Sequence, residues 1–70
     1  MELIPVTSSD IRAIGYDKAN STLVVAFHSG GTYQYFDVPE HLHSAFMSAE
    51  SKGQFLHQHI KYNYRYQKIS

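Results

Sequence analysis

Residues 22–37 read TLVVAFHSGGTYQYFD, and this stretch decides the fold. Its first half is rich in β-branched and aromatic residues and alternates large with small side chains, as a half-buried strand does. The large side chains that share one face are Leu23, Val25 and Phe27. Gly30 and Gly31 can adopt the positive φ angles that tight turns need. The stretch therefore predicts a β-hairpin with strands at residues 22–28 and 32–37.

A third strand is expected immediately before this hairpin. Residues 11–16, IRAIGY, are mostly apolar, and the turn-forming stretch DKANS at 17–21 separates them from the hairpin. Strands joined by short turns usually pair with their sequence neighbours. We therefore expect a three-stranded antiparallel meander, preceded by the polar residues 7–10 and a short extended segment.

Two short helices are predicted after the meander. Pro39 suits a first helical turn, and the following apolar residues recur at the helical spacing i, i+3, i+4 and i+7. These residues are Leu42, Ala45, Phe46 and Ala49. Ser51 and Gln54 form a capping-box pattern at the start of a second helix. The apolar side of that helix comprises Phe55, Leu56, His59 and Ile60.

The predicted fold class is α+β, with a three-stranded meander followed by two short helices. Residues 61–69, KYNYRYQKI, alternate at period two and are compatible with an additional C-terminal strand. The chain of 70 residues is expected to form a single domain over 1–70, near the lower size limit for one core. The expected core is Ile11, Ile14, Leu23, Val25, Phe27, Phe36, Leu42, Phe46, Phe55, Leu56 and Ile60.

Composition excludes several classes of protein. The chain has no cysteine, which rules out disulfides and cysteine-based zinc sites and favours a reducing compartment. The first residues, MELIP, lack the basic start of a signal peptide. No apolar run approaches the roughly 18 residues of a membrane span, so no membrane association is expected. The predicted location is the cytoplasm.

Charge is distributed unevenly along a chain whose formal net charge is zero. Residues 1–50 contain two basic and six acidic residues, a net charge of −4. Residues 51–70 contain four basic residues and no acidic one, a net charge of +4. Such asymmetry can mark a binding end of a molecule.

Several short motifs occur together along the chain. They are Ser8-Ser9, Gly15-Tyr16-Asp17, Leu23, Phe27, Gly30, Tyr33-Gln34-Tyr35, Val38-Pro39, Ser51-Lys52-Gly53, Phe55 and Ile60. With them, positions 5 to 69 resemble the KTSC domain family, named for the C-terminal extension of some lysyl-tRNA synthetases. The resemblance implies a domain that occurs by itself in bacterial or phage proteins and also fused to a synthetase. RNA binding is suggested by that fusion, which is an association at the level of the fold.

The central tyrosines admit two interpretations. Tyr33 and Tyr35 lie two residues apart, so both rings face the same side of a strand. Exposed, they would form a platform on which unpaired bases stack. The alternative is that they pack under the helices, which the small chain's need for aromatic core area favours.

The Ser51-Lys52-Gly53 triplet also admits two compatible interpretations. Free backbone N–H groups, a lysine and a glycine at the start of a helix would suit a phosphate. The simpler interpretation is an N-cap beside a solvated lysine.

The C-terminal residues interleave basic and aromatic side chains, with Lys61, Arg65 and Lys68 among Tyr62, Tyr64 and Tyr66. This pattern recurs in proteins that bind single strands, although an edge strand with inward tyrosines and protective charges would show it too. At most four phosphate contacts give a salt slope of about −3, so any affinity is expected to be modest.

The histidines and serines predict neither a metal site nor catalysis. Paired histidines at 41/43 and 57/59 would point about 200° apart on a helix, whereas helical zinc ligands lie three or four residues apart. No nucleophile elbow accompanies the serines. We therefore expect no metal, no cofactor and no catalytic residue. A metal site built from one histidine of each helix and a carboxylate such as Glu40 or Glu50 is the least favoured alternative.

The sequence therefore predicts a non-catalytic binding module with modest affinity for RNA or single-stranded nucleic acid. The residues expected to bind it are Lys52, Gly53, Lys61, Arg65, Lys68, Tyr33, Tyr35, Tyr62 and Tyr64. The alternative left open is a protein-interaction or homo-oligomerisation domain that uses a tyrosine-rich edge strand or the helix faces.

Overall fold

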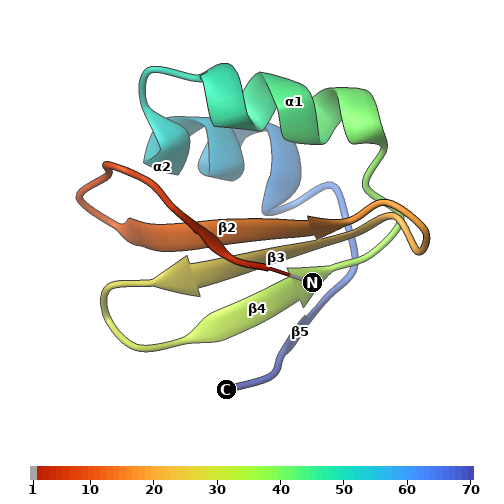
Figure 1. The fold of residues 1–70 in the computed structure, drawn as a ribbon, viewed down its shortest axis with the longest axis horizontal. Helices are drawn as coiled ribbons and strands as arrows, with labels where there is room; N and C mark the ends of the chain where they lie inside the picture. Colours follow the sequence, from red (N-terminus) through yellow and green to blue (C-terminus); the bar gives the residue numbers. More distant parts are fainter. Residues whose placement is uncertain (1) are drawn as a thin grey trace.

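A five-stranded antiparallel sheet is covered on one face by the helices (Figure 1). The computed structural model describes residues 2–70. The strands follow one another across the sheet in the order of the sequence. The elements are β1 (Ile4–Pro5), β2 (Ile11–Asp17), β3 (Thr22–Phe27), β4 (Thr32–Tyr35), α1 (Glu40–Ser48), α2 (Lys52–Phe55), η1 (Leu56–Ile60) and β5 (Tyr66–Lys68). No helix within the described residues is long and apolar enough to cross a membrane.

The predicted meander is confirmed as β2, β3 and β4, but the sheet has five strands rather than three. β1 pairs with β2 over only two residues, too few to produce a periodic sequence pattern. The additional C-terminal strand exists as β5, which pairs with β4. It comprises three residues, whereas the sequence pattern suggested an extended segment over 61–69.

The β3–β4 hairpin sets the register of the central sheet. Val25 lies opposite Tyr33, and the Phe27 amide donates to the Gly31 carbonyl at 2.8 Å to close the turn. Gly30 has a φ of 113°, a conformation that L side chains rarely adopt. The turn signal in the sequence is therefore confirmed.

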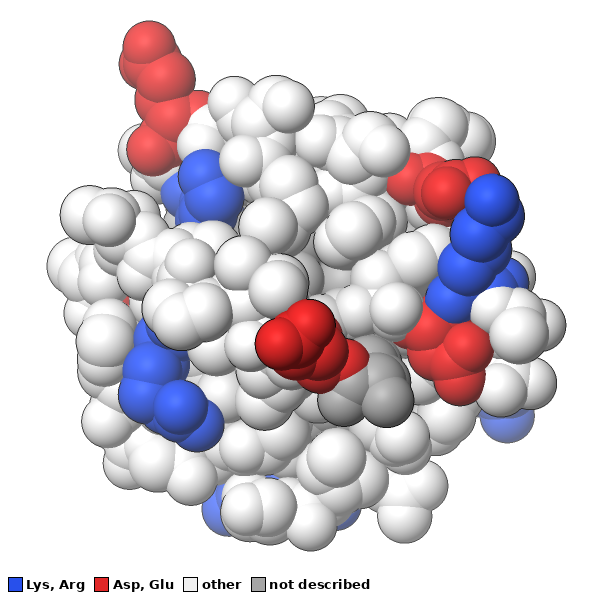
Figure 2. All heavy atoms as spheres, viewed as in Figure 1, with Lys and Arg blue, Asp and Glu red and all other residues white. Residues whose placement is uncertain are grey.

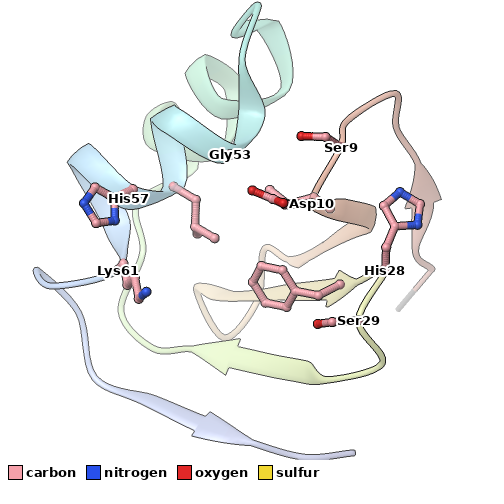
Figure 3. A pocket seen from close by; sticks show the side chains of 10 residues that line it. Ser9, Asp10, His28, Ser29, Gly53, His57 and Lys61 are labelled. Atoms are coloured by element: carbon pink, nitrogen blue, oxygen red, sulfur yellow. The ribbon is translucent and has the colours of Figure 1, made fainter.

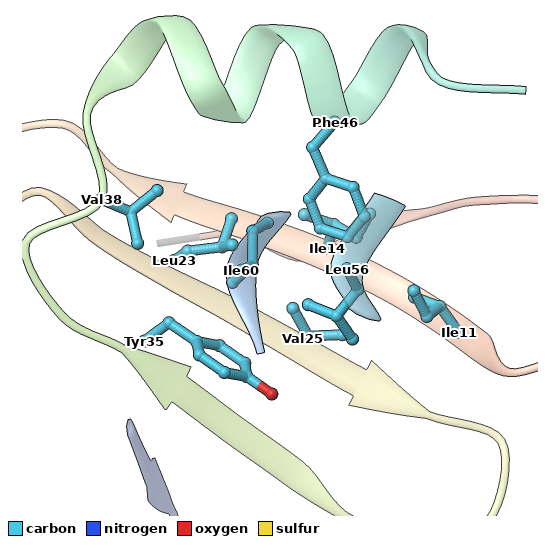
Figure 4. Close-up of a cluster of buried hydrophobic side chains, with 9 residues drawn as sticks. All are labelled: Ile11, Ile14, Leu23, Val25, Tyr35, Val38, Phe46, Leu56 and Ile60. Atoms are coloured by element: carbon cyan, nitrogen blue, oxygen red, sulfur yellow. The ribbon is translucent and has the colours of Figure 1, made fainter. Parts of the chain in front are cut away.

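The core lies between the sheet and the helices (Figure 4). Its buried members are Ile11, Ile14, Leu23, Val25, Tyr35, Val38, Phe46, Leu56 and Ile60. Seven of these nine belong to the expected core. Burial of Tyr35 agrees with the favoured interpretation of the central tyrosines, whereas Val38 was not expected. Phe36 was wrongly assigned to the core: side chains alternate along a strand, so Phe36 faces away from the side that Tyr35 occupies. Phe27, Leu42 and Phe55 pack against the core but remain partly exposed.

Both predicted helices form. α1 begins after Pro39 and buries Phe46, whereas Ala45 of the expected apolar stripe is exposed. The Ser51 hydroxyl accepts from the Gln54 amide at 3.3 Å, which confirms the Ser51 half of the predicted capping box. The second helix then widens into the π-helical turn η1, closed by the Lys61 amide donating to the Leu56 carbonyl at 2.7 Å.

A tyrosine connects β2 to the segment that leads into α1. The Tyr16 hydroxyl donates to the Val38 carbonyl at 2.6 Å. The Tyr16 ring also stacks on His43 of α1, with centroids 4.6 Å apart and planes 9° apart. This contact fixes the start of α1 against the sheet.

Replacing Tyr16 by Phe removes this hydrogen bond while keeping the ring. We expect Y16F to lower the free energy of unfolding by about 1–2 kcal/mol, because the carbonyl of the buried Val38 loses its donor. Urea denaturation measures the change, and Y62F serves as the control, since Tyr62 is exposed. Equal stability of Y16F and the wild type would contradict a role for this bond.

The stacked histidine predicts a pH dependence of stability. Burial lowers the pKa of His43 below its ordinary 6.5, and the nearby Glu40 carboxylate opposes this more weakly. The unfolded chain therefore binds a proton at His43 more readily than the folded chain does. The contribution of neutral His43 to the free energy of unfolding is therefore fully present above the ordinary pKa of histidine. It is lost as the pH falls from there through the lowered pKa of the folded chain.

We expect the free energy of unfolding to fall less in H43Q than in the wild type between about pH 7.5 and about pH 5. Denaturation at the two pH values measures this difference. His41 is exposed on the same helix, so H41Q is the control for removing a histidine that is not buried. Identical pH dependence of H43Q and the wild type would refute the assignment.

Candidate functional site

Three tyrosines cluster on the β4–β5 end of the helix-facing side of the sheet. Tyr35 lies opposite Tyr66 in the β4–β5 ladder, and Tyr33 lies on the same face two residues from Tyr35. The Tyr66 ring is 5.9 Å from the Tyr33 ring and 5.9 Å from the Tyr35 ring, measured between centroids. Tyr66 therefore bridges the two central tyrosines.

These rings form one wall of a groove of about 360 Å³, which we call the tyrosine groove. The opposite wall comes from η1 and the turn after it, so the groove lies where the helices stop covering the sheet. Its lining residues are Phe27, Ser29, Tyr33, Tyr35, Leu56, Lys61, Tyr62 and Tyr66.

The tyrosines differ in accessibility. Tyr35 is only 4% exposed, and burial together with the neighbouring Tyr33 and Tyr66 raises the pKa of its hydroxyl, which therefore stays protonated. Tyr66 and Tyr62 are 59% and 73% exposed. A Tyr33–Tyr35 platform is therefore not what the fold presents to solvent; the open rings are those of Tyr62 and Tyr66.

Two lysines flank the groove. Lys61 lines it, with its ammonium nitrogen 5.5 Å from the centre of the Tyr62 ring. Lys68 lies opposite Tyr33 in the ladder, and its side chain runs beside Gly31 and Tyr33 at the hairpin turn. Two of the four predicted cations thus accompany the aromatic rings.

Arg65 lies outside the groove. Its guanidinium lies 3.9 Å from the Asp37 carboxylate and 5.4 Å from the centre of the Phe36 ring. Both charged side chains are well exposed, so the ion pair contributes little to stability. Arg65 precedes Tyr66, and the alternation of side chains places it on the other face of the sheet.

Lys52 and Gly53 also lie apart from the tyrosines. The Lys52 ammonium donates to the Ala49 carbonyl at 2.7 Å and so satisfies a free acceptor at the end of α1. Gly53 lies against Asp10, on the loop before β2. The Ser51-Lys52-Gly53 triplet therefore joins the two helices and the Asp10 loop.

The expectation of an extended C-terminal segment is wrong for residues 61–64, whereas the Arg65 carbonyl accepts from the Phe36 amide at 2.9 Å next to β5. Residues 61–63 form a turn, in which the Asn63 amide donates to the Ile60 carbonyl at 3.1 Å. Tyr62 consequently points into solvent while Tyr64 packs against the core. An alternating sequence pattern does not reveal such a turn. The π-helical turn before it adds a residue to the helical repeat, and this changes which of the following side chains face the core.

A second cavity of about 340 Å³ adjoins the groove, and we call it the polar lobe. It shares Phe27, Ser29, Leu56 and Lys61 with the tyrosine groove. Figure 3 shows Asp10 on one side of the lobe and His57 and Lys61 on the other. The sequence pattern did not identify Asp10 or Phe27 as site residues, because they come from a loop and a strand far from the C-terminal segment. Tyr66 was part of the interleaved C-terminal pattern but was not among the residues expected to bind.

Residues 2–70 contain no group of three or more metal-binding side chains close enough together to hold an ion. The ring of His28, beside the lobe, meets the backbone carbonyl of Ser8 at 3.0 Å. Figure 2 shows acidic and basic side chains interspersed on one face of the molecule, without a patch of a single sign. The tyrosine groove itself is lined by aromatic rings and Lys61, with Lys68 beside Tyr33.

Lys52 and Arg65, the two basic residues that lie outside the groove, are expected to affect stability differently. K52M should lower the free energy of unfolding by about 0.5–1.5 kcal/mol, because the Ala49 carbonyl loses its donor. R65M should change it by less than about 0.5 kcal/mol, because the ion pair is exposed. Urea denaturation of both variants measures the two changes in the free energy of unfolding. A larger decrease in R65M than in K52M would contradict the roles given to these two side chains.

Comparisons with known proteins agree over nearly the whole chain. The model of the KTSC domain family matches residues 7–64. A protein of Tsukamurella paurometabola is 41% identical over 61 residues, which are 87% of this chain and 91% of that protein. The crystal structure of a KTSC domain protein from Yersinia pestis has a TM-score of 0.96 and 48% identity, covering 99% of this chain and 97% of that one.

A larger protein also contains a similar segment. A lysine–tRNA ligase of a Nostoc species is 37% identical over 68 residues. The match covers 97% of this chain but only 12% of the ligase.

Proposed function

The chain belongs to the KTSC domain family, and on that basis we propose that it is a non-catalytic module that binds single-stranded RNA in the tyrosine groove. The observation that carries the proposal is the exposed ring of Tyr66 beside Tyr33, with Lys61 and Lys68 at the margins. Stacking of a base on an aromatic ring contributes about 1–3 kcal/mol. The lysines add attraction for the phosphates that follow each base.

The relatives favour RNA over other ligands. The Nostoc protein is named for joining lysine to tRNA, and it contains a segment that resembles this chain. A domain of this kind therefore occurs in a protein that handles RNA. Only 12% of that ligase is matched, so the reaction in its name is no evidence for the same reaction in this chain.

The electrostatic contribution to binding should be small. Two lysines at the groove give a dependence of log affinity on log salt of about −1.4 for a single strand. Stacking, which salt screens little, should then supply most of the affinity. This pattern differs from that of a protein that binds polynucleotides through a wide cationic surface.

The second candidate is a protein-interaction or self-association domain. β5 is an edge strand, and its exposed Tyr66 together with Ile69, which is 46% exposed, could pair with another chain. Light scattering across a concentration series distinguishes the two candidates. A mass that rises to twice that of the chain, and is restored to the monomer by Y66K, would favour self-association.

The test of RNA binding is a titration of a short fluorescent RNA at low salt. Y66A should weaken binding by about 5- to 100-fold, because it removes an exposed stacking ring without emptying the core. K61M should also weaken it, whereas R65M, which removes a cation of the same charge outside the groove, should bind like the wild type. Equal losses in R65M and K61M, or no loss in Y66A, would refute the groove as the binding site.

A further inference from the structure

We propose that the polar lobe recognises the Watson–Crick edge of a guanine, with Asp10 accepting from the base and Lys61 donating to it. This inference deepens the proposed RNA binding and rests on it. It adds base specificity to a groove that would otherwise bind any sequence through stacking alone.

The polar lobe and the tyrosine groove lie side by side. Phe27, Leu56 and Lys61 line both cavities, and the Phe27 ring meets Tyr33 edge to face at 5.7 Å. A strand whose bases stack on Tyr66 and Tyr33 therefore leads toward Phe27 and the lobe. One base can enter the lobe while its neighbours stay in the groove. The volume of about 340 Å³ lies in the range of small-molecule sites.

The backbone of Asp10 is fixed on both sides. Its amide donates to the Ser8 hydroxyl at 3.3 Å, and its carbonyl accepts from the His28 amide at 2.9 Å. The carboxylate comes close to α2: a Cβ on Gly53 would lie 3.3 Å from one of its oxygens, tighter than most real contacts. Gly53 therefore gives the carboxylate its room at the lobe.

The Asp10 carboxylate is available for a ligand. Within residues 2–70, the ion pairs are Lys18–Glu40 and Arg65–Asp37, so Asp10 and Lys61 are not paired with each other. Both nevertheless line the same lobe, Asp10 from the loop before β2 and Lys61 from the turn after η1. An acceptor and a donor thus line one cavity.

Guanine matches this pair of groups better than the other bases do. An ionised carboxylate only accepts hydrogen bonds, and it can accept two in parallel. On the Watson–Crick edge, guanine presents two adjacent donors, N1–H and the N2 amine, next to the O6 acceptor. Adenine, cytosine and uracil each present a single donor group beside an acceptor, which the carboxylate repels. Lysine is a common partner of guanine O6.

The test uses five short RNAs that differ only at one central position in a uridine background: guanine, inosine, adenine, cytosine and uracil. We expect guanine to bind about 5- to 100-fold more tightly than adenine, cytosine or uracil. Inosine, which lacks the N2 amine, should fall between. Fluorescence anisotropy at fixed low salt measures all five affinities.

D10N should abolish the preference for guanine, because an amide both donates and accepts hydrogen bonds and no longer selects the two donors of that base. D37N should retain the preference. D37N is the matched control, because it removes an exposed carboxylate outside the lobe. Equal affinities of the wild type for all five RNAs, or a preference that survives in D10N and D10A, would overturn the guanine assignment and leave groove binding intact. Failure of every RNA to bind would overturn both.

Discussion

The two short helices cannot cover a five-stranded sheet, and this shortage of cover shapes the rest of the molecule. The helical layer consists of α1, with nine residues, and the nine residues of α2 and η1. It buries Ile14, Leu23 and Val25 completely, at the centre of the sheet. At the β4–β5 end the cover runs out, so that Tyr35 is buried while Tyr66, its partner in the ladder, is 59% exposed. The same apolar face thus serves as core at one end and as an open aromatic surface at the other.

This arrangement explains why charge along the sequence is a poor guide to the surface. The last 20 residues hold four cations and no acid, yet the fold assigns them to different tasks. Lys52 completes the end of α1 and Arg65 lies beside Asp37, which leaves Lys61 and Lys68 next to the tyrosines. Charges in one short segment point in several directions once that segment contains a helix, a turn and a strand. A groove of tilted and edge-on aromatic rings with two neighbouring lysines therefore stands in place of a basic patch.

Local patterns predicted those features that local forces determine. The alternation around Val25, the glycine turn at Gly30 and the cap at Ser51 each appear in the structure, because each depends on residues close together in the chain. The pattern could not predict β1, whose two residues have no period, or the turn at 61–63, which follows a π-helical widening. The site itself was predicted only in part. Tyr33, Tyr62 and Lys61 were named from composition, but Asp10 and Phe27 line the adjoining cavities from loops and strands far from them in sequence.

A site assembled from distant segments ties binding to folding. The walls of the two adjoining cavities come from the loop before β2, the β3–β4 hairpin, η1 and β5, so no single segment contains them. A ligand held by all of them would bind the folded chain and not the unfolded one, and would raise stability by mass action. In a domain of 70 residues with little core to spare, such a gain is a substantial fraction of the total stability. The incomplete helical cover therefore has two linked consequences: it limits the stability of the free domain, and it leaves open the aromatic face through which a bound strand would restore some of it.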